Sequence, residues 1–291
     1  MRLMTPHGVP VAYLRWDRPG APEAAGPTVV LIHGLTGRAA LWDGVARFLA
    51  DRGFQVLAPD LRNHGDAPRT PAASPRDCAR DVVALIAEVA PGPVDLVGHS
   101  FGAAVAWEVA AAWPDRVRRL VLEDQPPVPP AAGWAEWEAW AAAWPPRFAS
   151  REEGLAYLRR EGRSLPWWEP SLVPLPDGGW GWAFDIPGTL AMARHLYEAD
   201  PEAAWAQLAR VQAPTLVLRG SESTHLLPEV AREMVRTLPR GRLVTVPGAD
   251  HWIHRRPEPY ARLVAAFLTA DDPLACDLPL PDPGPAGSEA G

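Results

Sequence analysis

The pentapeptide Gly98-His99-Ser100-Phe101-Gly102 constrains the fold of this chain more than any other feature. The apolar run 94–97 before it is typical of a buried strand, and the Ala-rich run 103–110 after it is typical of a helix. A strand that turns sharply into a helix at a serine is a nucleophile elbow, in which glycines allow the tight turn because a Cβ there would clash. The pattern predicts that the Ser100 hydroxyl stands above a sheet, with the Phe101 N–H free to face a developing oxyanion.

The rest of the chain alternates strand and helix patterns, which predicts an α/β fold with a mostly parallel sheet covered by helices on both faces. One helix has a clear start, because Ser74 is a good N-cap and Pro75 suits the first helical position. The predicted strands are 9–15, 28–32, 54–58, 94–97, 117–122, 214–218 and 243–246, and further helices are predicted over 39–52, 228–238 and 257–268.

This alternation is interrupted between residues 125 and 209, where we find no strand pattern. We expect residues 1–124 and 210–270 to form the core and 125–209 to form a helical, Trp-rich cap over the carboxyl edge of the sheet, where α/β folds bind ligands. Residues 271–291 are rich in Pro, Asp and Gly, so we expect a disordered tail. The insertion holds nine of the 14 tryptophans, namely Trp134, Trp137, Trp140, Trp144, Trp167, Trp168, Trp180, Trp182 and Trp205.

Composition narrows the function classes. The net charge is −7 and the basic residues are dispersed, which argues against a nucleic-acid partner. No apolar run is long enough to span a bilayer and no N-terminal stretch has a signal pattern, so we expect a cytoplasmic protein. Cys78 and Cys276 are expected to be free thiols. Neither metal-ligand spacing nor a phosphate-binding or dinucleotide fingerprint is present, so we expect no metal and no cofactor.

A serine needs a base to act as a nucleophile. His251 lies in the loop after the last predicted strand, in the run Gly248-Ala249-Asp250-His251-Trp252. This late position fits the chain order serine, acid, histidine. We prefer His251 over His254, a turn further on, and over His99, which belongs to the elbow itself.

A second oxyanion donor is expected in the loop after an early strand. His33-Gly34-Leu35-Thr36-Gly37 follows the apolar run that ends at Ile32. We therefore expect the Leu35 N–H to act together with the Phe101 N–H.

With these motifs in hand, the chain resembles the serine-nucleophile α/β-hydrolases, and is similar to small bacterial esterases and abhydrolase-domain proteins. The resemblance covers about residues 8–122 and 210–269, and the insertion resembles nothing we can name. It implies a cofactor-free hydrolase. The motifs that carry it are His33-Gly34, residues 58–66, the elbow, and 248–251 with Pro257-Glu258 behind it.

The identity of the triad acid is left open between two residues. In many members of this family the acid follows the strand equivalent to 214–218, but here that loop, 219–225, contains no aspartate. Glu222 could serve there, whereas some similar esterases place the acid at the position of Asp124, after the strand that follows the elbow helix. We favour Asp124 over Glu222, because the loop of Asp124 lies at the carboxyl edge of the sheet beside the serine. Either acid would hold the His251 imidazole in one tautomer. Asp250 is interpreted as a turn residue.

The tryptophans allow two interpretations. Aromatic side chains at helical spacing can dock the insertion on the core, or they can line an acyl-binding pocket, since such pockets are mostly apolar. Packing is the better interpretation for any single tryptophan. The candidates for substrate contact are Trp137, Trp140 and Trp252.

These inferences predict a carboxylesterase-like serine hydrolase that acts on a small-molecule acyl ester. A thioesterase, a C–C bond hydrolase or a perhydrolase with the same triad are alternatives within enzymes. A non-catalytic small-ligand receptor on the same fold is the alternative from another class. The oligomeric state, the acyl length and the leaving group do not follow from the sequence.

Overall fold

A central sheet of eight strands organises the computed structural model, which describes residues 1–17, 26–71, 73–162 and 168–281. The order is β1-β2-β4-β3-β5-β6-β9-β10, with β1 and β2 antiparallel to their neighbours and the others parallel. The strands are β1 Arg2–Met4, β2 Pro10–Trp16, β3 Thr28–Ile32, β4 Gln55–Pro59, β5 Val94–His99, β6 Val117–Glu123, β9 Thr215–Gly220 and β10 Gly241–Val246. This confirms the predicted mostly parallel sheet.

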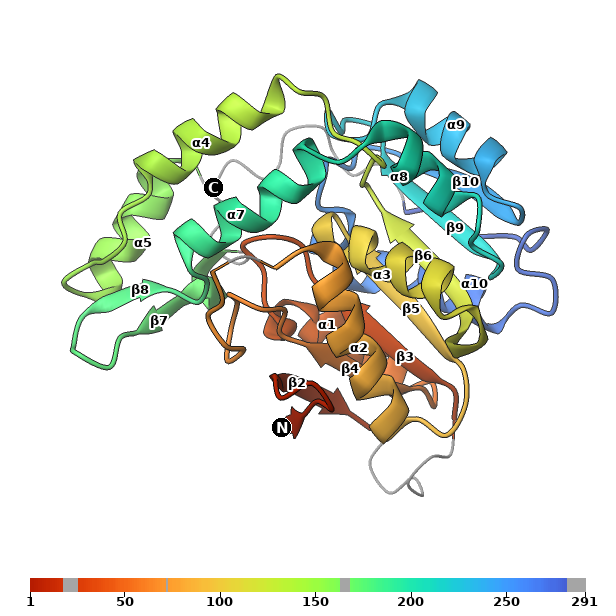
Figure 1. Ribbon diagram of the computed structural model, residues 1–291, viewed down its shortest axis with the longest axis horizontal. Coiled ribbons are helices and arrows are strands. Elements are labelled where there is room, and N and C mark those ends of the chain that lie inside the picture. The colour runs from red at the N-terminus through yellow and green to blue at the C-terminus, as the bar shows by residue number, and fades with distance from the viewer. Residues whose placement is uncertain (18–25, 72, 163–167, 282–291) are drawn as a thin grey trace.

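Helices cover both faces of this sheet, as predicted (Figure 1). Alternate residues of each strand point to opposite faces, so Val30 and Leu96 join one core while Val29 and Val97 join the other. The first core is closed by α2 Pro75–Val89, α3 Phe101–Ala112 and α9 Pro228–Thr237, and the second by α1 Asp43–Ala50 and α10 Pro257–Thr269. Short 3₁₀ turns lie at η1 Ala39–Trp42, η2 Pro114–Arg116 and η4 Ile253–Arg255.

The start of α2 is the one predicted from the sequence. The Ser74 hydroxyl accepts from the Asp77 N–H at 3.2 Å, and the Asp77 carboxylate accepts from the Ser74 N–H at 3.1 Å. This reciprocal capping box satisfies two backbone donors, and an N-cap of this kind contributes about 1 kcal/mol.

The inserted segment 125–209 extends from the core in Figure 1 and is mostly helical, but it also contains strands. The expectation of no strand pattern there was wrong, because β7 Leu172–Pro174 and β8 Trp180–Trp182 pair as an antiparallel hairpin. Strands of three residues are too short to show a convincing period of two, and the glycine between the two tryptophans of 180–182 is not typical of a strand interior. The segment's helices are α4 Gly133–Ala143, α5 Arg151–Arg160, α7 Ile186–Tyr197 and α8 Pro201–Leu208, with η3 Glu169–Ser171.

Aromatic side chains give this segment a core of its own. Trp144 lies at its centre, with ring centroids 4.2 Å from Trp182 and 5.1 Å from Trp168. Packing is therefore the main role of these three tryptophans, as the sequence favoured for any single one. Trp167, also counted in the sequence, lies outside the described residues. The buried members of this cluster are Trp144, Phe148, Tyr157, Leu158, Trp168, Leu172, Trp182 and Phe184.

The C-terminal tail, predicted to be disordered, packs on the core over its first part. Arg242 donates to the carbonyl oxygen of Cys276 at 2.6 Å, and Leu278 contacts the second core. Residues 282–291 lie outside the described residues. Cys78 and Cys276 are free thiols, as expected.

Replacing Gly102 with alanine is expected to destabilise the fold. A Cβ at Gly102 would lie 2.2 Å from the Ile32 carbonyl oxygen, so strand and helix would have to separate. Overpacking of this kind costs about 1–3 kcal/mol, and a chain of this size loses roughly 2–4 °C of Tm per kcal/mol. Thermal unfolding of Gly102→Ala checks this. Gly92→Ala is the control, because a Cβ at Gly92 meets nothing within 4 Å, and equal Tm values for the two variants would contradict the prediction.

Candidate functional site

The elbow predicted from the sequence is present between β5 and α3. Ser100 has φ 52° and ψ −125°, a left-handed conformation that costs a non-glycine residue about 1–3 kcal/mol. Neighbouring backbone holds it there, because the Ser100 N–H donates to the Glu123 carbonyl at 2.9 Å and the Ser100 carbonyl accepts from Ala103 at 2.8 Å. A Cβ at Gly98 would lie 2.3 Å from the Gly102 carbonyl oxygen, so this turn requires glycine.

Asp124 and His251 meet beside the elbow. Asp124 directly follows β6, and its Oδ2 accepts a hydrogen bond from His251 Nδ1 at 2.8 Å. Both side chains are buried, Asp124 completely and His251 to all but 8%. The bond places the imidazole proton on Nδ1 and leaves Nε2 with the lone pair that a general base needs.

Two further donors hold the Asp124 carboxylate. The Gly220 N–H donates to Oδ1 at 3.2 Å, and the Ser223 hydroxyl donates to Oδ2. Both donors come from the end of β9 and the loop after it, which also carries Glu222. Sequence reasoning missed Ser223, although its place three residues after the strand in that loop was the available signal.

Glu222, the alternative acid, lies exposed on the same loop. Its backbone N–H donates to the Ala249 carbonyl at 2.9 Å, and no hydrogen bond joins its side chain to His251 within the described part of the chain. Asp250 accepts from the Trp252 N–H at 3.0 Å and from Arg255 at 2.6 Å, so it bonds to its own turn as predicted. The geometry therefore brings Asp124 to His251, and not Glu222 or Asp250.

Burial governs the titration of this pair. Burial raises the pKa of Asp124 to about 6, against the opposing effect of the bonds from Ser223 and Gly220. Burial also lowers the pKa of His251 well below its ordinary value, and the neighbouring His225 lowers it further. The His225 ring stacks on His251 with centroids 3.9 Å apart and planes 17° apart. At neutral pH the arrangement is therefore an ionised carboxylate beside a neutral imidazole.

The loop that carries Leu35 is pressed against the elbow. A Cβ at Gly34 would lie 3.0 Å from the Ser100 Cβ, so the loop reaches Ser100 only because residue 34 is glycine. Two histidines fix its course, because His33 Nε2 accepts from the Leu61 N–H at 3.0 Å and His64 Nε2 accepts from the Thr36 N–H at 3.1 Å. Leu35 lines the same pocket as Ser100, and Phe101 begins α3 directly after it. Their role as oxyanion donors stays a prediction.

A cavity of about 530 Å³ opens between the elbow and the inserted segment. Ser100, His251 and the three tryptophans proposed for substrate contact all line it. Trp168, which was not proposed, lines it as well. Besides Ser100, His251 and Trp168, the lining consists of Leu35, Thr36, His99, Gln125, Pro126, Pro129, Pro130, Ala132, Gly133, Glu136, Trp137, Trp140, Ala193, Leu196, Tyr197, Thr224, His225 and Trp252.

Gln125 is a polar neighbour of Ser100 that the sequence analysis did not single out. The Ser100 hydroxyl lies 3.5 Å from Gln125 Oε1, and Gln125 Nε2 donates to the Pro126 carbonyl at 2.9 Å. Its position directly after Asp124 was the available signal. The amide gives the hydroxyl a weak acceptor when no substrate is bound.

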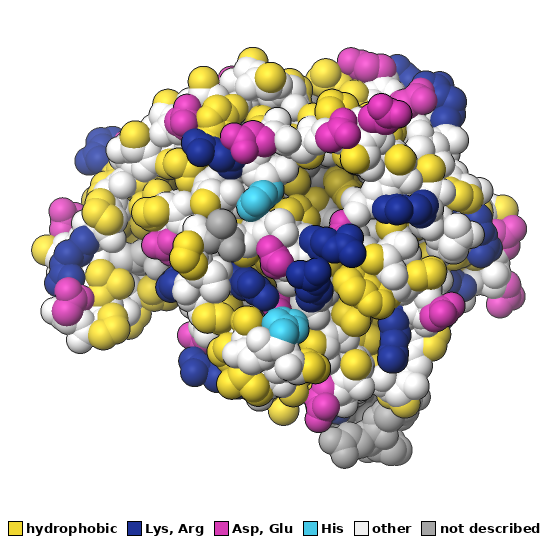
Figure 2. Space-filling view, viewed as in Figure 1, with side chains coloured by type: hydrophobic (Ala, Val, Ile, Leu, Met, Phe, Trp, Pro, Cys, Tyr) yellow, Lys and Arg dark blue, Asp and Glu magenta, His cyan; other side chains and the backbone are white. Residues whose placement is uncertain are grey.

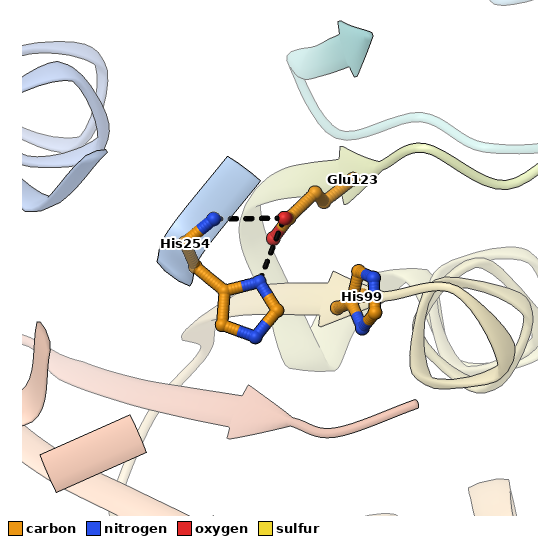
Figure 3. Close-up of side chains that lie close together, drawn as sticks. All are labelled: His99, Glu123 and His254. Carbon is orange, nitrogen blue, oxygen red and sulfur yellow. Dashed lines mark hydrogen bonds and ion pairs between the residues drawn. The ribbon is translucent and has the colours of Figure 1, made fainter. Parts of the chain in front are cut away.

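Two groups of side chains place possible metal ligands within 4.8 Å of one another, counted over the described residues. One group is Asp124, His225 and His251, and the other, shown in Figure 3, is His99, Glu123 and His254. In each group the carboxylate already accepts hydrogen bonds, from His251 and from His254 respectively. A metal ion would have to displace these bonds, so we interpret both groups as hydrogen-bonded clusters.

Comparisons with known proteins identify the family of this chain. The model of the "Alpha/beta hydrolase family" matches residues 29–263. The chain is 31% identical over 259 residues to the sn-1-specific diacylglycerol lipase ABHD11 of Mus musculus, covering 84% of this chain and 82% of that protein. It is 30% identical over 257 residues to 2-(acetamidomethylene)succinate hydrolase of Mesorhizobium japonicum, covering 85% and 90%. The chain therefore belongs to the alpha/beta hydrolase family.

A solved structure supports the same assignment. The crystal structure of E-2-(acetamidomethylene)succinate hydrolase superimposes with a TM-score of 0.81 at 26% identity, covering 93% of this chain and 98% of that one. The relatives are named as hydrolases and lipases, which supports an enzyme of the hydrolase class. None of the helices in the described ranges is both long and apolar enough to cross a bilayer.

The pH dependence of activity should follow the Asp124–His251 pair. Because the raised pKa of Asp124 is about 6, its carboxylate becomes protonated as the pH falls through this value. The proton removes the negative charge that holds and stabilises the His251 imidazole, so kcat/KM for an uncharged ester is expected to fall below about pH 6. This acidic part of the pH profile reports the coupled titration of Asp124 and His251, and not the pKa of one residue. Initial rates from pH 4.5 to 9 measure it, with circular dichroism to verify folding. A profile that stays flat down to pH 4.5 would contradict the assignment.

Proposed function

We propose that this protein hydrolyses uncharged carboxylic esters through a Ser100–His251–Asp124 triad. The observation that carries the proposal is the 2.8 Å bond between Asp124 and His251 in the wall of the cavity that contains Ser100. A buried carboxylate that orients a neutral imidazole beside a serine at a strained elbow is the arrangement that activates a serine hydroxyl.

In the proposed reaction, His251 takes the Ser100 proton as the serine oxygen attacks the acyl carbonyl. The N–H groups of Leu35 and Phe101 stabilise the oxyanion, and such a donor is worth roughly 3 kcal/mol in other enzymes. The protonated His251 then gives its proton to the leaving alkoxide, which forms an acyl-Ser100 intermediate. A water molecule, deprotonated by the same imidazole, releases the acid and restores Ser100.

The cavity supports an uncharged acyl group. Trp137, Trp140 and Leu196 supply apolar surface, and Glu136 is the only lining residue of the described chain with a formally charged side chain at neutral pH. No arginine lines the cavity among these residues, so a free carboxylate on the substrate would find no cation and would face Glu136. Basic and acidic side chains are interspersed elsewhere on the face in Figure 2.

We also propose that residues 125–209 act as a cap. Helices α4 and α7 both contribute to the cavity lining, through Trp137 and Leu196 among others, while Ser100 and His251 come from the core. A substrate in this cavity would therefore contact both parts at once. The cap then sets the acyl preference, while the core supplies the chemistry.

The serine and the acid can be tested together with a fluorophosphonate and intact mass spectrometry. We expect single labelling of the wild type, none of Ser100→Ala, and labelling of Asp124→Asn slowed by about 10³–10⁴-fold, because the wrong imidazole tautomer then faces Ser100. Glu222→Gln is the matched control, since Glu222 is exposed and makes no hydrogen bond to His251 among the described residues, and it should label at the wild-type rate.

Two outcomes would overturn parts of this proposal. Slow labelling of Glu222→Gln with normal labelling of Asp124→Asn would move the acid to Glu222. Absence of both labelling and ester turnover in the wild type would favour the non-catalytic ligand receptor.

Substrate charge gives a second test. We expect p-nitrophenyl butyrate to be hydrolysed with a kcat/KM about tenfold or more above that of the p-nitrophenyl hemisuccinate anion, a difference of ~1.4 kcal/mol or more. Glu136→Gln should narrow the gap by removing the repelling carboxylate. Glu138→Gln is the control, because Glu138 is on the same helix but outside the cavity lining, 3.9 Å from Arg194. Equal rates for the two esters with the wild type would contradict an uncharged acyl pocket.

A further inference from the structure

A buried cluster lies directly behind the proposed triad. Its members are His99, Glu123 and His254, which are 3%, 0% and 4% exposed and face one another in Figure 3. Each is close in sequence to a proposed triad residue: His99 precedes Ser100, Glu123 precedes Asp124, and His254 follows His251 by three residues. None has a chemical step in the proposed reaction.

Glu123 holds the segment that follows His251. Its Oε1 accepts two hydrogen bonds from His254, one from the backbone N–H at 3.1 Å and one from Nδ1 at 2.7 Å. Trp42 stacks on the His254 ring with centroids 4.3 Å apart and planes 26° apart. His254, the middle residue of η4 and three residues after His251, is thus fixed from two sides.

His99 ties the backbone of His251 to the elbow. His99 Nε2 donates to the His251 carbonyl oxygen at 3.0 Å, which requires the proton on Nε2. The His99 ring also lies against both other imidazoles, with centroids 4.7 Å from His251 and 4.6 Å from His254. The residue next to the proposed nucleophile therefore bonds to the main chain of the proposed base.

The surroundings keep these imidazoles neutral. Burial lowers the pKa of His99 well below its ordinary value and that of His254 to about 3. Neutral rings can pack closely without charge repulsion, so the directional hydrogen bonds decide how the rings are oriented. The hydrogen bonds therefore give the cluster its geometry.

We propose that His99, Glu123 and His254 position the catalytic base, by fixing the main chain of His251 relative to Ser100. Asp124 orients the His251 imidazole by accepting the hydrogen bond from Nδ1–H. The cluster, in contrast, fixes the position of the His251 backbone, from which the ring extends. The proposal rests on the proposed triad. A misplacement of about 1 Å at a reacting group can cost on the order of 10²-fold in rate, so loss of these bonds should act on kcat.

Paired substitutions separate positioning from stability. Glu123→Leu removes the acceptor of both His254 bonds, and Glu123→Gln keeps an acceptor oxygen. Asp95→Leu is the matched control, because Asp95 is equally buried on β5 and bonded to Arg118, but lies at the other end of that strand from Ser100. Should Glu123→Leu fail to fold, His254→Phe keeps an aromatic ring against Trp42 and removes the Nδ1–H donor, while the backbone N–H donor remains.

Each variant is titrated with a fluorophosphonate, and kcat is expressed per reactive Ser100. We expect Glu123→Leu or His254→Phe to lose about 10–100-fold in kcat with KM within about twofold, and Glu123→Gln to recover most of the loss. Asp95→Leu should lower Tm and leave kcat per reactive site unchanged. Fewer reactive sites with unchanged kcat, or an equal loss in Asp95→Leu, would show that the cluster is only structural. A wild type without labelling or ester turnover would instead refute the proposed function.

Discussion

The close approach of three backbone segments at the elbow is the constraint on which the rest of the site depends. Gly98 lets β5 turn back on α3, and Gly102 lets α3 pass against the carbonyl oxygen of Ile32 at the end of β3. No side chain fits at either contact, so the serine can stand at the tip of the strand only while both glycines are present. The left-handed conformation of Ser100 follows from this packing.

Parallel pairing then gathers residues that are distant in sequence. His99 and Glu123 are register partners on β5 and β6, so the residues after them, Ser100 and Asp124, leave the same edge of the sheet side by side. Strand β9 adds Gly220 and Ser223 at that edge, and the loop after β10 adds His251. Strand register, together with the loops after β9 and β10, therefore brings together both the proposed triad and the cluster behind it.

The sequence predicts the features that depend on strands and on local turns, but few of the contacts that depend on how the loops fold. The elbow, the sheet and the position of His251 follow from runs and turns that are local in sequence. The choice between Asp124 and Glu222 does not, because both residues follow strands that end at the same edge. The two residues differ in how the loop 221–225 folds, because the Ser223 hydroxyl bonds to Asp124 whereas Glu222 is exposed. The β7–β8 hairpin was not predicted for a related reason. Its backbone pairing is regular, but its two strands of three residues show no clear hydrophobic pattern in the sequence.

Backbone strain links the proposed triad to the cluster of His99, Glu123 and His254. Ser100 and Asp124 both have positive φ, at 52° and 50°, although neither is glycine, and they occupy equivalent places after paired strand residues. Such strain persists only where the surroundings over-determine the backbone. The Glu123 carbonyl accepts from the Ser100 N–H, and the Leu218 carbonyl accepts from the Asp124 N–H at 2.8 Å. Glu123 thus stabilises the strained Ser100 through its backbone and the segment after His251 through its side chain, so one buried residue couples the geometry of the proposed nucleophile and the proposed base.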